Sequence, residues 1–181
     1  MPTIIIRAAI PADALCIGVL GTQVFLDTYA TDGISPSLAR EVQHHMSTGA
    51  IEAAMALPAA RTLVAEHDTH VRHMVGFVQL TLGTQHELVD SDNAVEMNRL
   101  YVLERFTGRG IGRMLLESAE ALAVSSGAEV LWLTAWEGNH RARAFYASQG
   151  YEDAGATMYT FEGAEFENRL FMRRLDQQRG R

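Results

Sequence analysis

The spacing of apolar residues predicts a chain that alternates between strands and helices. Residues 3–8 are rich in isoleucine and predict a strand, and Asp13 is placed to cap a helix from Ala14 to about Thr28. A turn-rich segment at 28–37 then leads to a second helix, expected from about Ser37 to Ala56. The apolar residues that recur at helical spacing in the first helix are Leu15, Val19, Leu20, Val24 and Phe25.

The middle of the chain is expected to form a hairpin and a further strand. Residues 62–66 and 71–82 predict the two hairpin strands, with the sequence HDTH at the turn. The polar loop 83–93 separates this hairpin from a strand at 95–103. Hairpin strands of this kind favour antiparallel pairing in this part of the sheet.

The second half alternates strands with helices. A helix follows the glycine-rich residues 107–112, a strand is expected at 129–136, and Asn139 is placed to cap a helix that ends before Gly150. Two C-terminal strands joined near Glu162 complete a mixed α/β sheet in one domain, residues 1–175, with a frayed tail at 176–181. The helix after the glycines is expected to bury Ile111, Met114, Leu115, Ala119 and Leu122.

Length and charge narrow the class of protein. The 181 residues suffice for one core, and 48% hydrophobic and 20% charged residues are ordinary for a globular protein. A formal net charge of −7 argues against nucleic acid or anionic membrane as a partner, because both need a basic surface. No run approaches the ~20 apolar residues of a membrane span, and the N-terminal run is too short for a signal peptide. A cytoplasmic protein is therefore expected, with its one cysteine, Cys16, buried among apolar neighbours.

Three glycines, Gly108, Gly110 and Gly112, stand where a helix is expected to begin. Glycine weakens a helix by about 1 kcal/mol relative to alanine, so these positions need a reason. The start of a helix presents unpaired N–H groups and partial positive charge, and glycines let an anion approach that backbone, where Arg109 and Arg113 add charge. The segment predicts a phosphate cradle, although a plain turn explains the glycines alone equally well. The dinucleotide fingerprint would need glycine at Arg113, and the P-loop pattern is absent.

A second pair of residues favours the cradle. Asn139 and Tyr146 are seven residues apart, so two helical turns place them on one face, roughly 10 Å apart along the axis. Together, the strand, glycine turn, helix, strand and helix with N-x6-Y resemble the GNAT superfamily of N-acetyltransferases. In that family a turn of the form [Q/R]-x-x-G-x-[G/A] binds the pyrophosphate of acetyl-CoA. Residues 105–110 match this form, but 107–112 run directly into the helix as in the family, with Thr107 where Gln or Arg is usual.

The resemblance covers nearly the whole chain. The stretches FLDTYA, LWLTAWEGNHRARAFYASQGYEDAGA and FENRLFMRRL are further similar to bacterial spermidine/spermine acetyltransferases of the PaiA type. The implied fold is a central, mostly antiparallel twisted sheet flanked by helices. The implied activity is transfer of an acetyl group from acetyl-CoA to a primary amine, with a polyamine as the expected acceptor.

The resemblance also implies roles for individual residues. Tyr146 is expected to protonate the CoA thiolate as general acid, and Asn139 to contact CoA; the alternative for Tyr146 is a core aromatic. Backbone atoms are expected to hold the pantetheine arm at Leu100, Tyr101 and Val102. The residues expected at the pyrophosphate are Thr107, Gly108, Arg109, Gly110, Ile111, Gly112 and Arg113.

The base and the acceptor site are less constrained by the sequence. Glu96 lies on the strand expected beside the acetyl group and is the candidate base, with a water relay or a plain strand carboxylate as alternatives. Phe25, Asp27 and Tyr29 lie where the family lines its acceptor groove, and an acidic, aromatic lining suits a cation. Taken singly, Phe25 fits a place in the core slightly better, and Asp27 fits a helix end slightly better.

Several alternatives remain open at this level. The acceptor could instead be a peptide N-terminus, an amino acid or a drug amine, and a CoA-binding regulator without catalysis is a further alternative. A homodimer is a possible assembly, since many relatives are dimers. His67, His70 and His73 are spaced like metal ligands, but a hairpin turn would point them apart, so no metal is expected.

Overall fold

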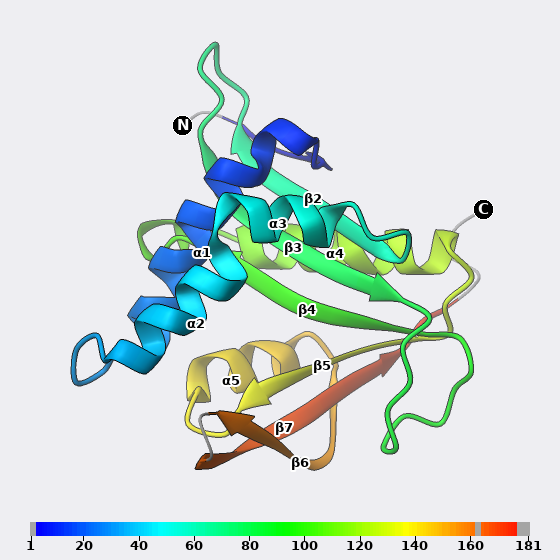
Figure 1. Cartoon of the computed structure of the whole chain (residues 1–181). Helices are drawn as coiled ribbons and strands as arrows, with labels where there is room; N and C mark the ends of the chain where they lie inside the picture. The colour runs from blue at the N-terminus through cyan, green and yellow to red at the C-terminus, as the bar shows by residue number, and fades with distance from the viewer. Residues whose placement is uncertain (1–2, 162–163, 177–181) are drawn as a thin grey trace. The chain divides into compact units, whose positions relative to one another are not determined.

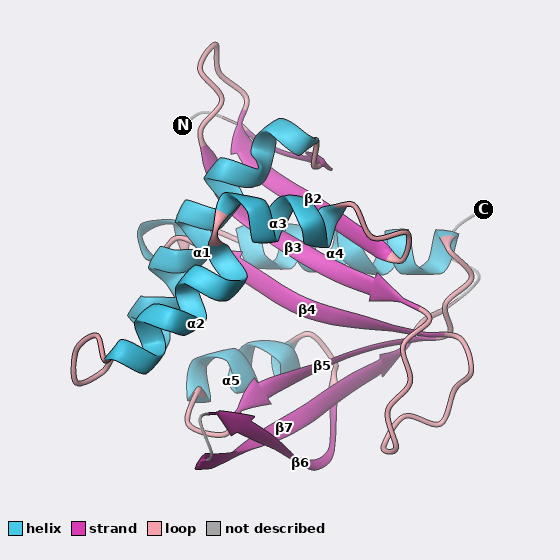
Figure 2. Ribbon diagram, in the orientation of Figure 1, coloured by secondary structure: helices cyan, strands magenta, loops and turns pink. Residues whose placement is uncertain are grey.

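The computed structural model describes residues 3–161 and 164–176, and within them seven strands form a sheet in the order β1-β2-β3-β4-β5-β7-β6 (Figure 1). Strands β4 and β5 pair in parallel, whereas β1–β2, β5–β7 and β6–β7 pair antiparallel. This confirms the expected mixed, mostly antiparallel sheet with helices beside it (Figure 2). The elements in chain order are β1 (Ile4–Ala8), η1 (Pro11–Asp13), α1 (Ala14–Tyr29), α2 (Pro36–Met46), α3 (Thr48–Met55), β2 (Ala60–His67), β3 (Met74–Leu82), β4 (Ala94–Val102), η2 (Glu104–Phe106), α4 (Ile111–Ser125), β5 (Val130–Trp136), α5 (His140–Ser148), β6 (Glu152–Phe161) and β7 (Ala164–Arg174).

The chain divides into two compact units. Unit 1 comprises Met1–Gln79 and Arg99–Ala119, and unit 2 comprises Leu80–Asn98 and Glu120–Arg181. Strands β3 and β4 and helix α4 each contribute residues to both units. The expectation of a single domain over residues 1–175 stays a prediction, and both the expected turn at Glu162 and the tail from residue 177 lie outside the described residues.

Helices α1, α2 and α3 pack on β2 and β3 to form the core of unit 1. The predicted face of α1 was partly wrong. Leu20 is buried and Val24 and Phe25 pack against the core, but Leu15 is 59% exposed and Val19 64%, because small and branched residues make up the buried face. A Cβ added to Gly18 would collide with the carbonyl oxygen of Met46, so glycine is needed for the close approach of α1 to α2. Cys16 is exposed rather than buried, because it lies on the outward face of α1 with Leu15 and Val19. The buried residues of α1 are Ala14, Ile17, Gly18, Leu20 and Gly21.

The helix expected from Ser37 to Ala56 is in fact two helices, α2 and α3. Ser47 adopts an extended conformation between them, with φ −61° and ψ 150°. Its hydroxyl accepts a hydrogen bond from the Ala50 N–H, so Ser47 ends α2 and caps α3. The prediction failed because the apolar pattern continues through a residue whose side chain competes for the backbone.

Asp13 precedes α1 as predicted, but its carboxylate does not cap that helix. It accepts a hydrogen bond from the Ile10 N–H at 2.8 Å and binds the Arg7 guanidinium at 2.7 Å. Arg7 also binds Glu66, which is buried and bound in addition by Arg72. The Arg7 guanidinium holds the pKa of both Asp13 and Glu66 below the usual range of a carboxyl group, against the opposing effect of burial.

Unit 2 is built on β5, β6 and β7, with the loop at residues 83–93 folded onto them. Val89 of this loop joins a core cluster with Ala94, Val130, Trp132 and Leu170.

In α4, Met114 is 37% exposed, whereas Leu116 and Ala123 are buried, so the predicted face of that helix was partly wrong. Among the described residues, no helix is long and apolar enough to cross a membrane.

Candidate active site

The glycine turn needs glycine for its backbone conformation. Gly108 and Gly110 have φ of 72° and 81°, which residues with a Cβ rarely adopt, although a Cβ at either would meet no atom within 4 Å. The carbonyl of Gly110 accepts the first helical hydrogen bond of α4, from the Met114 N–H at 3.0 Å. Gly110 therefore occupies the N-cap position of α4. It has no side chain that could accept hydrogen bonds from the N–H groups of the first helical turn. Gly112 is the second residue of α4, so the helix begins within the 107–112 segment.

The amides of this turn are available to a ligand. Within residues 3–161 and 164–176, the backbone N–H groups of residues 108–113 donate no hydrogen bond. Such a run of donors, at the positive end of the α4 dipole, fits the phosphates of a nucleotide-like molecule. Thr107 contributes differently, because its hydroxyl already donates to the Glu104 carbonyl at 2.8 Å.

The two arginines of the turn have different partners. The Arg109 guanidinium lies over the Phe106 ring, 5.2 Å from its centroid, and the His67 ring meets the same ring at 5.4 Å in a T-shaped arrangement. Arg113 instead binds Glu117 at 2.8 Å across one turn of α4, with both side chains exposed. Among residues 3–161 and 164–176, Arg109 is thus held beside the free amides by its contact with the Phe106 ring and by no carboxylate.

The predicted pantetheine segment, Leu100–Val102, forms the end of β4 in unit 1. A Cβ at Gly76 of β3 would lie 2.7 Å from the Tyr101 carbonyl oxygen, so glycine is needed for the close approach of these strands. The Tyr101 ring packs against Phe77 at 5.4 Å, and burial raises the pKa of its hydroxyl. Tyr101 is therefore a neutral phenol at working pH.

The predicted acceptor residues are only partly brought together. Phe25 and Tyr29 are one helical turn apart at the end of α1, and their rings pack at 4.7 Å. Tyr29 is close enough to Tyr101 to influence its ionisation. Asp27 is exposed and, being two residues from each aromatic, lies on another side of α1.

In unit 2, Glu96 lies at the end of the parallel ladder. It pairs with Trp132 of β5, and the His86 ring packs on Trp132 at 5.2 Å. Burial raises the pKa of Glu96, although a hydrogen bond from Asn98 and the nearby His86 oppose that shift. The Thr81 hydroxyl donates to Asn98 Oδ1 at 2.7 Å, which leaves the amide nitrogen of Asn98 to serve the carboxylate.

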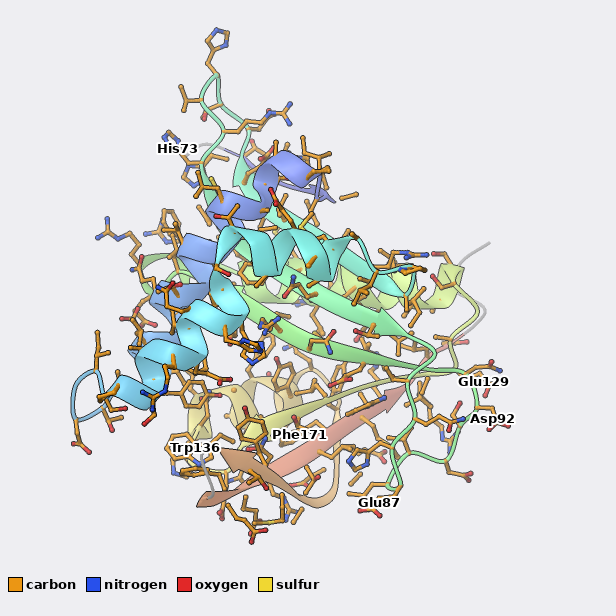
Figure 3. The ribbon with its side chains drawn as sticks, in the orientation of Figure 1. His73, Glu87, Asp92, Glu129, Trp136 and Phe171 are labelled. Carbon is orange, nitrogen blue, oxygen red and sulfur yellow. The ribbon has the colours of Figure 1, made fainter. Side chains whose placement is uncertain are left out.

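Helix α5 carries the two remaining predicted residues. Asn139 caps it as expected, since its Oδ1 accepts from the Ala142 N–H at 3.0 Å. A Cβ at Gly138 would lie 2.5 Å from the Trp136 ring, so Trp136 (labelled in Figure 3) folds over the turn that starts α5. Tyr146 is 7% exposed, with the rings of Phe145 and Tyr151 5.2 and 5.9 Å from its own.

The sequence reasoning missed three residues with specific geometry. Arg99 of β4 donates to Gln79 Oε1 at 2.8 Å, His86 covers Trp132, and Phe106 supports Arg109. Arg99 lies on a strand that also carries Glu96 and Asn98, so its charge gave no separate signal in the sequence. His86 and Phe106 lie in a loop and a short 3-10 helix, where spacing carries no information. Among the described residues, no three histidine, cysteine, aspartate or glutamate side chains are arranged to hold a metal ion.

Known proteins share both the sequence and the fold. Residues 28–151 match the model of the acetyltransferase (GNAT) family. An uncharacterized N-acetyltransferase of Lactobacillus delbrueckii subsp. lactis is 30% identical over 132 residues, which are 72% of this chain and 74% of that protein. The structure of PaiA N-acetyltransferase from Thermoplasma acidophilum with coenzyme A has a TM-score of 0.70 at 19% identity, covering 95% and 99% of the two chains. The spermidine/spermine N-acetyltransferase SpeG of Vibrio cholerae has a TM-score of 0.64 at 16% identity, covering 98% and 97%.

These matches agree with the local geometry found in the chain. The family model spans the end of α1, the glycine turn, Asn139 and Tyr146. A strand, a glycine turn with free amides, and a helix capped by Asn139 occur in the order expected from the resemblance. The chain therefore belongs to the GNAT family of acetyltransferases and is an N-acetyltransferase that acts with acetyl-CoA.

Proposed function

We propose that the chain transfers the acetyl group of acetyl-CoA to a small primary amine by direct attack in a ternary complex. Bound acetyl-CoA supplies the activated thioester. The amine nitrogen forms a bond to the acetyl carbon, the carbon–sulfur bond breaks, and the proton lost by the amine must be accepted by the protein or by water. The observation that carries the proposal is the run of free amides at residues 108–113 beside two glycines of positive φ.

In this proposal the glycine turn binds the pyrophosphate. Its amides, the positive end of α4 and the Arg109 guanidinium supply donors and charge for two phosphate groups. Arg113 contributes less, since Glu117 already neutralises it. Backbone groups of Leu100, Tyr101 and Val102 are proposed to hold the pantetheine arm, and the Asn139 amide nitrogen to contact CoA.

Glu96 is proposed as the base that takes the proton from the amine, directly or through water. An ordinary glutamate has a pKa near ~4.3, too low for an efficient base at neutral pH. The burial that raises the pKa of Glu96 moves it toward the working range. Asn98, fixed by Thr81, orients the carboxylate.

Tyr146 is proposed as the general acid. Its hydroxyl would donate a proton to the sulfur as the carbon–sulfur bond breaks, which avoids release of a bare thiolate. The rings of Phe145 and Tyr151 hold the side chain in one orientation, as positioned proton transfer requires.

Polyamines are the acceptor class that the sequence resemblance favours. The net charge of −7 suits a cationic substrate, and SpeG, which has the same fold, is named as a spermidine/spermine acetyltransferase. A cytoplasmic location is part of the proposal, because acetyl-CoA is made and used inside cells.

The test is a turnover assay with purified protein, acetyl-CoA and a panel of primary amines. Release of free CoA thiol that depends on the amine, together with an N-acetylated product seen by mass spectrometry, is the expected result. Thiol release at the same rate without any amine, and no acetylated product, would contradict the proposal.

A further inference from the structure

Arg99 is a partly buried cation with neutral partners. It lies on β4 in unit 1, and its Nη1 donates to Gln79 Oε1 at 2.8 Å. Gln79 is only 6% exposed, so its buried side-chain amide holds the guanidinium in place. Within residues 3–161 and 164–176, Arg99 forms no ion pair with a carboxylate.

Other arginines of the chain show what a compensated guanidinium looks like here. Arginines that bind at least one carboxylate in the described part of the chain include Arg7, Arg72, Arg113, Arg169 and Arg173. Removing a charge partly from water is costly unless an opposite charge or several hydrogen bonds replace the water. Arg99 is partly buried, but within the described residues no carboxylate compensates its charge.

The neighbouring phenol does not supply that charge. Tyr101 interacts with Arg99, but burial raises the pKa of its hydroxyl, so it stays neutral. A guanidinium has five N–H donors in a planar fork, and Gln79 engages one nitrogen. The remaining donors suit the two oxygens of a carboxylate.

The position of Arg99 connects it with the predicted acceptor residues. Arg99 and Tyr101 are alternate residues of β4, so their side chains share one face of the strand. Tyr101 interacts with Arg99 and with Tyr29, and the Tyr29 ring packs on Phe25 at 4.7 Å. All of these side chains belong to unit 1. The cation therefore lies in the same cluster of side chains as the aromatic pair assigned to the acceptor.

We propose that Arg99 binds a carboxylate of the acceptor, so that the amine acetylated is an amino acid rather than a polyamine. This rests on the proposed transfer of an acetyl group to a small primary amine, and it assigns an amino acid as the acceptor in place of the polyamine that the resemblance favours. A polyamine offers no anion to Arg99 and would bring further positive charge beside it. An amino acid places one carboxylate on the guanidinium fork while its amine is acetylated.

The experiment compares matched acceptors that differ only by the carboxylate. L-phenylalanine with phenethylamine, L-tryptophan with tryptamine, and L-leucine with isoamylamine are assayed beside spermidine. In the wild type, kcat/KM for at least one amino acid is expected to exceed that of its decarboxylated partner, and that of spermidine, by at least about tenfold. Tenfold corresponds to ~1.4 kcal/mol, about the lower end of the range for a hydrogen bond to a charged group. Arg99→Gln is expected to remove this preference by raising KM for the amino acid. Arg99→Lys keeps the charge without the fork and is expected to be intermediate.

Two controls separate the possible failures. Arg61→Gln removes an arginine that binds only the backbone carbonyls of Pro58 and Ala60, and it should leave the preference unchanged. Acetyl-CoA binding is measured by calorimetry for each protein. If acetyl-CoA does not bind the wild type, the proposed function itself fails. If acetyl-CoA binds, three results would each overturn only the carboxylate assignment. The first is a preference for spermidine or the decarboxylated amines, and the second is that no amino acid is acetylated. The third is an Arg99→Gln variant that keeps the preference of the wild type.

Discussion

The guanidinium of Arg109 lies 5.2 Å from the centroid of the Phe106 ring, which also contacts His67. This stack joins the end of β2, the short helix η2 and the glycine turn within unit 1. It holds a positive charge beside the free amides of residues 108–113 without neutralising it, as a carboxylate would. An aromatic support is thus suited to a phosphate site, because the cation keeps its full charge for the ligand.

Replacing Phe106 tests that support. A cation–π contact at an exposed site is worth ~0.5–1 kcal/mol, so Phe106→Leu is expected to raise the Kd of acetyl-CoA about two- to fivefold. Phe106→Tyr keeps the ring face and should stay within about twofold of the wild type. Calorimetric Kd values for the three proteins decide the matter: equal affinity of the leucine variant, or equal loss in both variants, would contradict the role of the ring.

Tyr146→Phe removes the proposed general acid while keeping the ring in its aromatic cluster. Turnover is expected to fall at least about tenfold, with little change in acetyl-CoA affinity, because proton donation matters only as the carbon–sulfur bond breaks. The matched control is Tyr151→Phe, which removes a hydroxyl bound to Glu120 at 3.0 Å and should affect stability rather than turnover. Unchanged turnover in Tyr146→Phe would remove this hydroxyl from the mechanism.

Glu96→Gln tests the base through the pH profile. As the pH falls, protonation of Glu96 is expected to lower kcat/KM of the wild type, and burial places this acid limb above the usual pKa of glutamate. The glutamine variant should lose that limb and fall about a hundredfold or more in rate. Glu129→Gln, which alters an exposed carboxylate, should keep the wild-type profile. An acid limb that persists in Glu96→Gln would favour a water relay instead.

Arg7 is predicted to link stability to pH through Asp13 and Glu66. Their pKa values are lowered in the folded state, so this stability is present above their unfolded pKa values, near ~4, and is lost as the pH falls through the folded values. Arg7→Met should cost about 2–3 kcal/mol at neutral pH, since Glu66 is buried and keeps only Arg72.

The same variant should show a weaker loss of stability on acidification than the wild type. Urea unfolding at several pH values measures both effects. Arg113→Met breaks an exposed pair and should cost no more than about 0.5 kcal/mol. An Arg7 variant as stable as the Arg113 variant, with unchanged acid sensitivity, would contradict this account.

The sequence was sufficient for the order of the strands and of the helices, apart from the break between α2 and α3, and for the glycine turn. Strong local signals account for these features: a run of isoleucines in β1, a strongly apolar β5, an Asn139 cap confirmed by the hydrogen bond that its Oδ1 accepts from the Ala142 N–H, and glycines with positive φ at 108 and 110. Each depends on backbone preferences that act within a few residues, so one sequence is enough to predict them.

The errors came from packing and side-chain interactions that the spacing of apolar residues does not show. Gly18 and Gly21 bury the small face of α1 because α2 approaches closely, and this turns Leu15 and Cys16 outward. Asp13 was predicted to cap α1, but Arg7 recruits its carboxylate. The sequence also could not show that Arg99 has no carboxylate partner among the described residues, because that depends on which side chains the fold brings to it.

The most direct test of the account is the affinity for acetyl-CoA of the wild type and of Gly110→Ala, measured by calorimetry. Alanine at φ 81° costs roughly 1–2 kcal/mol and turns the amides away, so binding should weaken about five- to thirtyfold. Gly49→Ala, in α3 and equally open to a Cβ, is the control and should bind like the wild type. The predicted result is near-stoichiometric binding of acetyl-CoA by the wild type and by Gly49→Ala, and weaker binding by Gly110→Ala. A wild type that does not bind acetyl-CoA, or a Gly110→Ala variant that binds it equally well, would contradict the assignment of the glycine turn as the phosphate cradle.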